Sequence, residues 1–119
     1  MLRIKNGRRL LNKMIEEYLK KVYEYNSKLP KGVTLKPFHY VRSKGKTYVY
    51  IGKYFYKYER VNGKLKWKYV GKEPPKGCPP PPFFPLDGFS ARVEGEDLLV
   101  SEEVYRKYLK DVLQRETVA

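Results

Sequence analysis

The chain has 119 residues, enough for one domain with a modest core and too few for two full domains. Its formal net charge of +13 favours polyanionic partners, nucleic acid first among them. One Cys and one His exclude an internal disulfide and a four-ligand zinc site, so we expect no cofactor. No apolar run of about 18 residues occurs, so we expect a cytoplasmic protein without a membrane partner. Abundant Lys, Tyr and Glu favour a thermophilic source.

The charge is concentrated in the first two thirds of the chain. Residues 1–76 hold 21 basic and 5 acidic side chains, whereas residues 77–119 hold 5 basic and 8 acidic ones. Such an imbalance costs stability through self-repulsion unless a polyanion relieves it. We therefore expect the binding function to lie within residues 1–76.

The first expected element is an amphipathic helix over residues 8–28. Its apolar side chains recur with a spacing of three and four at Leu11, Ile15, Tyr18, Val22 and Tyr25. The segment Leu29-Pro30-Lys31-Gly32 ends it, because proline cannot continue the hydrogen-bond ladder. We expect this apolar stripe to cover a sheet; the alternative is that it packs on a partner helix or forms the seam of a homodimer.

Residues 38–72 form the expected β-meander. Phe38–Ser43 predicts a strand that turns at Lys44-Gly45 into a second strand from Lys46. Asn62-Gly63 is typical of a type I′ hairpin turn, which pairs Val61 with Lys64. Gly52-Lys53 either continues one long strand or forms a type II′ turn, so the meander has three or four strands.

This register gives the second hairpin two faces, because side chains alternate with a period of two. The aromatic face pairs Tyr56 with Tyr69, Tyr58 with Trp67 and Arg60 with Leu65. The cationic face carries Lys53, Phe55, Lys57, Glu59 and Val61 opposite Lys64, Lys66, Lys68, Val70 and Lys72. We expect the aromatic face to be core beneath the helix; its alternative use is as a platform on which bases stack.

A Pro-rich connector is expected over residues 73–86, and a short hairpin and a helix over residues 87–115. Phe83 and Phe84 are too apolar for a free linker and should pack back on the sheet; the alternative is a ligand for a proline-reading domain. Phe89–Val93 and Asp97–Val100 predict the hairpin. Ser101 should cap the final helix.

Motifs for nucleotide hydrolysis, serine hydrolysis and zinc proteolysis are missing from the sequence, so we expect no enzymatic activity and no catalytic residue. Tyr105 and Tyr108 raise the hypothesis of tyrosine-dependent strand transfer, or of a nuclease. Strand-transfer enzymes of that type need a metal held by paired histidines, and His39 is the only histidine. We interpret His39 as a strand residue and Cys78 as structural or incidental.

The hairpin carries a resemblance on the residues Gly45-Lys46-x-Tyr48-x-Tyr50 and Asn62-Gly63-Lys64-x-Lys66-x-Lys68-Tyr69-Val70-Gly71-Lys72. It resembles a tyrosine-rich hairpin that recurs in small basic proteins of archaea, their mobile elements and their viruses. The likeness spans residues 44–72 and implies a nucleic-acid-associated role in genome maintenance or gene regulation. A viral source would imply the host cytoplasm.

The sequence thus predicts an α+β fold, an antiparallel meander of three or four strands packed by an N-terminal and a C-terminal helix, in one domain over residues 1–119. The predicted function is nucleic-acid binding, to duplex DNA in preference to RNA, through phosphate contacts of low sequence specificity. The predicted contact residues are Arg8, Arg9, Lys44, Lys46, Lys53, Lys57, Arg60, Lys64, Lys66, Lys68 and Lys72. The alternative is a structural or interaction protein of a virus or mobile element, a virion component or an inhibitor, that binds an acidic protein surface.

Overall fold

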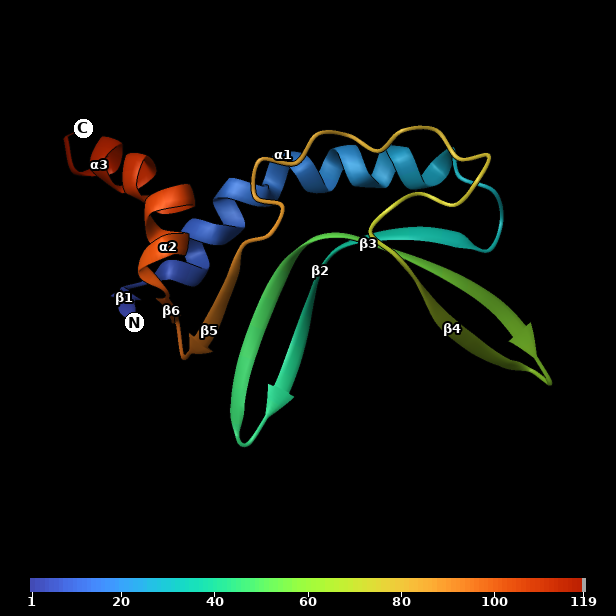
Figure 1. The fold of residues 1–119 in the computed structure, drawn as a ribbon, viewed down its shortest axis with the longest axis horizontal. Helices are drawn as coiled ribbons and strands as arrows, with labels where there is room; N and C mark the ends of the chain where they lie inside the picture. Colours follow the sequence, from blue (N-terminus) through green and yellow to red (C-terminus); the bar gives the residue numbers. More distant parts are fainter. Residues whose placement is uncertain (119) are drawn as a thin grey trace. The chain divides into compact units, whose positions relative to one another are not determined.

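The computed structural model describes residues 1–118, and the side chains of residues 1–114 (Figure 1). Ala119, the last residue of the predicted domain, lies outside the described residues, and so does the side chain of Arg115, the last residue of the predicted helix. The fold is α+β. Its elements are β1 (Leu2–Ile4), α1 (Gly7–Ser27), β2 (Val33–Ser43), β3 (Lys46–Val61), β4 (Lys64–Gly71), β5 (Ser90–Glu94), β6 (Asp97–Val100), α2 (Glu102–Val104), the π-helical turn η1 (Tyr105–Leu109) and α3 (Lys110–Val118).

The strands of the described chain form one six-stranded sheet in the order β1-β6-β5-β3-β2, with β4 paired to β3. The sheet thus has more strands than the three or four predicted for the meander, because further strands join it. The meander β2-β3-β4 is present, and β3 continues through Gly52 without a turn, which leaves three strands in it. The predicted second hairpin adds β5 and β6 to the same sheet, and β1 was not predicted because three residues carry no periodicity.

The described residues divide into two compact units. Unit 1 contains Met1–Met14, His39–Ile51 and the chain from Gly88 onward, and unit 2 contains Ile15–Phe38 and Gly52–Asp87. The elements α1, β2 and β3 each run from one unit into the other. The expectation of a single domain over residues 1–119 stays a prediction.

Unit 1 is built on the antiparallel ladder of β1, β6, β5 and the first part of β3. Val49 of β3 pairs with Ala91 of β5, and Arg3 of β1 pairs with Leu99 of β6. The buried apolar side chains of unit 1 are Ile4, Leu11, Val49, Ile51, Phe89, Ala91, Leu98, Val100 and Leu109. Arg3 also bonds both Asp97 (2.9 Å) and Glu94 (2.7 Å), which ties β1 to the β5–β6 hairpin.

The predicted cap of the C-terminal helix is confirmed. The Ser101 hydroxyl accepts a hydrogen bond of 3.1 Å from the Val104 backbone N–H. The helix then passes through η1, a wider turn, before it continues as α3. Leu109 is buried, and the Tyr108 ring packs edge-on against Phe89 at 5.7 Å, so Tyr108 has the packing role expected of it.

Unit 2 contains the β3–β4 hairpin in the predicted register. Val61 pairs with Lys64, and Tyr58 with Trp67. Asn62 and Gly63 both have positive φ, 52° and 77°, as a type I′ turn requires. A bulge at Phe55/Tyr56 shifts the ladder by one residue near the base of the hairpin.

The expectation that the helix covers the aromatic face is wrong. The hairpin side chain that is fully buried is Phe55, on the opposite face, and Tyr25 of α1 packs edge-on against it at 6.3 Å. Trp67 and Tyr69 remain 47% and 49% exposed. The physical reason is that α1 has another apolar partner, because Phe84 of the Pro-rich connector stacks on Tyr18 with the ring centroids 3.5 Å apart.

Two polar contacts fix this part of α1. The Asn26 side chain donates to the Leu35 carbonyl (3.0 Å) and accepts from the Leu35 N–H (2.8 Å), so it holds β2 as a neighbouring strand would. The Tyr25 hydroxyl donates to the Pro79 carbonyl at 2.7 Å. Phe84 is buried, as expected, but its ring stacks on α1, whereas the prediction placed it on the sheet. Phe83 is 84% exposed, so the prediction for it is wrong.

Candidate nucleic-acid interface

Beyond Phe55 the β3–β4 hairpin exposes both of its faces. On the cationic face Lys57 lies directly opposite Lys68, Glu59 opposite Lys66, and Val61 opposite Lys64. The four lysines are exposed. Among the described residues none of these lysines forms an ion pair with a carboxylate. The hairpin therefore presents four exposed lysines to solvent on one face, with Glu59 as the acid among them.

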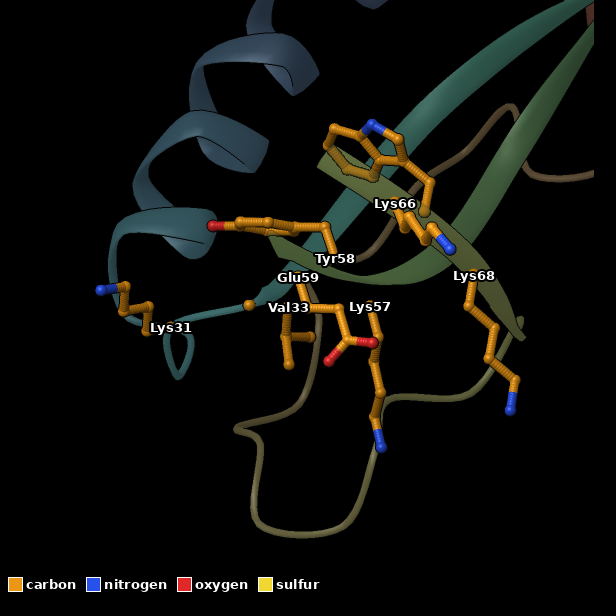
Figure 2. Close-up of a pocket in the computed structure, with 9 residues that line it drawn as sticks. Lys31, Val33, Lys57, Tyr58, Glu59, Lys66 and Lys68 are labelled. Carbon is orange, nitrogen blue, oxygen red and sulfur yellow. The ribbon is translucent and has the colours of Figure 1, made fainter. Parts of the chain in front are cut away.

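The pair Lys57–Lys68 is the most informative part of this cluster. Directly opposed side chains of an antiparallel pair have Cβ atoms about 4.5–5.5 Å apart, and like charges there are destabilising. A pocket of about 540 Å³ lies at this pair. Figure 2 shows Lys57 and Lys68 extending to the same side of the hairpin as Val33, away from the ring of Tyr58. The pocket is lined by Lys31, Gly32, Val33, Lys57, Tyr58, Glu59, Lys66, Trp67 and Lys68.

The aromatic face is a connected cluster of rings. Trp67 lies 5.0 Å from Tyr58 and 6.4 Å from Tyr56, and Tyr69 lies 5.4 Å from Tyr56, measured between ring centroids. Lys36 of β2 brings its Nζ to 4.3 Å from the Trp67 centroid, within the range of a cation–π contact. This cluster combines exposed aromatic surface with a positive charge.

Comparison of this chain with protein-family models, with curated proteins and with solved structures gives no match.

Two further residues of the predicted interface in unit 2 have partners of their own. Lys53 forms an ion pair with Asp87 at 3.6 Å, so its charge is already compensated. Arg60 donates to the Gly63 carbonyl at 3.4 Å beside the turn. Lys72 lies exposed after the end of β4. The assignment of these three to the interface stays a prediction.

The remaining predicted residues belong to unit 1. Arg8 donates to the Gly95 carbonyl at 3.2 Å. Arg9 lines a small pocket of about 170 Å³ together with Lys5, Asn6, Leu10, Lys13 and Leu113. Lys44, with φ of 52°, occupies the β2–β3 turn and is exposed, as is Lys46. Unit 1 thus has a separate group of basic residues.

Two lysines of the hairpin site were missed by the sequence reasoning. Lys31 lies in the turn after α1, and the Tyr58 N–H donates to the carbonyl of the neighbouring Gly32 at 2.8 Å. Lys36 belongs to the first part of β2, which begins at Val33 and not at Phe38 as predicted. No local sequence pattern marks either lysine as part of the site, because each is brought to the hairpin by contacts between segments that are distant in the sequence.

Other chemistry is sparse in the described part of the chain. Residues 1–118 contain no cluster of three or more His, Cys, Asp or Glu that could hold a metal ion. None of their helices has both the length and the apolar character needed to cross a bilayer. Burial raises the pKa of Tyr18 to about 12, and its hydroxyl has no hydrogen-bond partner. Burial also raises the pKa of Tyr25.

Proposed function

We propose that this protein binds nucleic acid, with phosphates held by the exposed lysines of the cationic face. The observation that carries the proposal is the cross-strand pair Lys57–Lys68 at the pocket, with Lys66 on the same face. Lysines that served only solubility would be more stable beside acids than opposite one another. A bound phosphate chain removes that repulsion, whereas water only screens it.

Phosphate contacts from lysines imply low sequence specificity. An ammonium group is a point charge on a flexible stem and lacks the planar fork with which Arg reads a base edge. A two-stranded β-ribbon fits the major groove of B-DNA, which supports duplex DNA as the ligand of this face. The resemblance to the tyrosine-rich hairpin of small basic archaeal and viral proteins implies a role in genome maintenance or gene regulation, which agrees with this proposal. We also propose a cytoplasmic location. We propose that the protein is a binding protein and not an enzyme.

The test is fluorescence anisotropy with labelled duplex DNA at increasing salt. If six to eight lysines contact phosphates, the slope of log K against log salt should be about −5 to −7. The triple variant Lys57→Glu, Lys66→Glu, Lys68→Glu should bind duplex DNA too weakly to measure at near-physiological salt.

The matched control is the triple variant Lys20→Glu, Lys21→Glu, Lys76→Glu, which changes the net charge equally at exposed positions outside the hairpin. It should keep most of the affinity. Circular dichroism of both variants checks that the fold is intact. Unchanged affinity in the hairpin variant, or equal losses in the two, would contradict the assignment of the binding site.

An acidic protein surface is the second candidate partner. It is favoured by the exposed apolar side chains of β4, Leu65 (44% exposed) and Val70 (40% exposed), which phosphate binding does not need. A structural or inhibitory protein of a virus or mobile element would use them. Binding of an acidic polypeptide in preference to DNA, or assembly into large particles without DNA, would support this alternative.

A further inference from the structure

We propose that the aromatic face of the β3–β4 hairpin stacks unpaired bases, so that single-stranded nucleic acid is a ligand of the hairpin in its own right. This inference rests on the proposed function, nucleic-acid binding: phosphates of the same strand would be held by Lys36 and Lys31, the lysines on the side of the rings. The inference adds single strands to the ligands of the hairpin, because a duplex presents only its phosphate backbone to the cationic face.

The rings at the centre of the aromatic face are exposed although they are held in place. Trp67 and Tyr69 have about half of their surface in water although four ring contacts, at 5.0–6.4 Å, hold them and their tyrosine neighbours in place. Core packing therefore does not account for these residues. Rings held in this way have already lost their rotamer freedom, so a base that stacks on them gains contact at little entropic cost.

Positive charge lies beside the rings. Lys36 Nζ lies 4.3 Å from the Trp67 centroid and 4.9 Å from that of Tyr56. A hollow of about 590 Å³ adjoins the tip of this face, within the size range of small-ligand sites. Its lining combines the aromatic and apolar residues Tyr58 and Leu65 with the cations Lys31 and Arg60, and also contains Gly32 and Glu59. Aromatic surface beside cations suits a base and its phosphate.

These observations favour unpaired bases over the other occupants. In a duplex the base faces are already stacked on one another and cannot reach a side chain lying outside the helix. An apolar protein partner would gain nothing from Lys36, Lys31 and Arg60. A second copy of the chain would bring the same cations face to face, which electrostatic repulsion opposes.

The experiment uses Trp67, the single tryptophan of the chain, as a direct reporter. The full chain is titrated with oligo(dT), with an abasic deoxyribose-phosphate oligomer of the same length, with oligo(U) and with blunt duplex DNA. Oligo(dT) should quench the Trp67 fluorescence and bind more tightly than the abasic oligomer, which has the same charge and no bases. The oligo(U) titration separates RNA from DNA as the source of the bases.

Substitution of Trp67 makes the test specific. Trp67→Ala should weaken oligo(dT) binding by about 10- to 100-fold, the usual effect of removing one stacked aromatic, and weaken abasic and duplex binding far less. Trp67→Phe should retain most of the affinity. The matched control is Tyr23→Ala, which removes an aromatic ring of 80% exposure from α1 and should change nothing.

The two proposals fail in different ways. Equal affinity for oligo(dT) and the abasic oligomer, without quenching, would overturn the stacking inference and leave the phosphate proposal intact. Quenching by an acidic polypeptide and not by oligo(dT) would overturn it in favour of a protein partner. Duplex binding that survives in the Lys57, Lys66, Lys68 triple variant would overturn the phosphate proposal itself. If Trp67→Ala does not fold, the quenching of the unmodified protein and the Trp67→Phe affinity decide the question.

Discussion

Neutralising one lysine of the opposed pair should stabilise the free protein while it weakens binding. In Lys68→Gln the charge opposite Lys57 disappears, and the chain keeps a side chain of similar length. Two ammonium groups about 6 Å apart in water repel by about 0.7 kcal/mol, and salt at about 0.1 M reduces this to about 0.4 kcal/mol. This agrees with the range of about 0.2–1 kcal/mol for cross-strand pairs. For a chain of this size the melting temperature should rise by about 2 °C.

Thermal unfolding at low and high salt checks this result. The gain should shrink as salt rises, because screening removes the repulsion from the unmodified protein as well. Lys20→Gln is the matched control, since it removes the same charge from an exposed position on α1. A gain in Lys20→Gln equal to that in Lys68→Gln would show that net charge alone is responsible. A lower melting temperature in Lys68→Gln would refute the reasoning.

The same variant should lose affinity for duplex DNA. Loss of one phosphate contact reduces the steepness of the salt dependence by about 0.9. A lysine that serves only solubility would leave both the affinity and the salt slope unchanged. The combination of a more stable free protein and a weaker complex is therefore specific to a functional like-charge pair.

Three further predictions concern the fold. Gly7→Ala should lower the melting temperature, because an added Cβ would meet a leucine side chain at 2.9 Å. The overpacking cost of about 1–3 kcal/mol exceeds the gain in helix propensity, and an unchanged melting temperature would contradict this. Tyr18→Phe should raise the urea midpoint, since it removes a buried hydroxyl that lacks a partner, and a lower midpoint would mean that the hydroxyl is bonded. Arg3 lowers the pKa of Glu94 below its ordinary 4.5, and the Asn6 N–H together with Arg3 lowers the pKa of Asp97 below its ordinary 3.8. The stability that these two carboxylates gain from Arg3 should be complete above their ordinary pKa values and should disappear as the pH falls through their lowered pKa values. Arg3→Gln should therefore destabilise the protein at pH 7 and not in acid.

The hairpin register was predictable because it depends on local chemistry. Asn62-Gly63 accepts positive φ at both turn positions, and this turn fixes which lysines oppose one another along the two strands. The start of the C-terminal helix was predictable for a similar reason, since the Ser101 hydroxyl satisfies an N–H that the helix leaves free. The opposition of Lys57 and Lys68 thus follows from the sequence alone.

The buried face of the hairpin was not predictable, because both faces carry apolar groups. The choice depends on Tyr18 and Tyr25 of α1, which pack on Phe84 and Phe55, and no local pattern encodes these long-range contacts. The start of β2 escaped the sequence for the same reason, since it is bonded to the Asn26 side chain. Lys31 and Lys36, which accompany the aromatic face, were missed as a consequence.

The pairing of β1 with β6 has a consequence for synthesis of the chain on the ribosome. Arg3 bonds to Asp97, 94 residues further along. At elongation rates of about 5–20 residues per second, the first strand waits about 5 to 20 seconds for its partner. The segments of unit 2 end at Asp87, so the binding hairpin is made before β6 exists. A nascent chain therefore carries its cationic hairpin before the sheet of unit 1 is able to close.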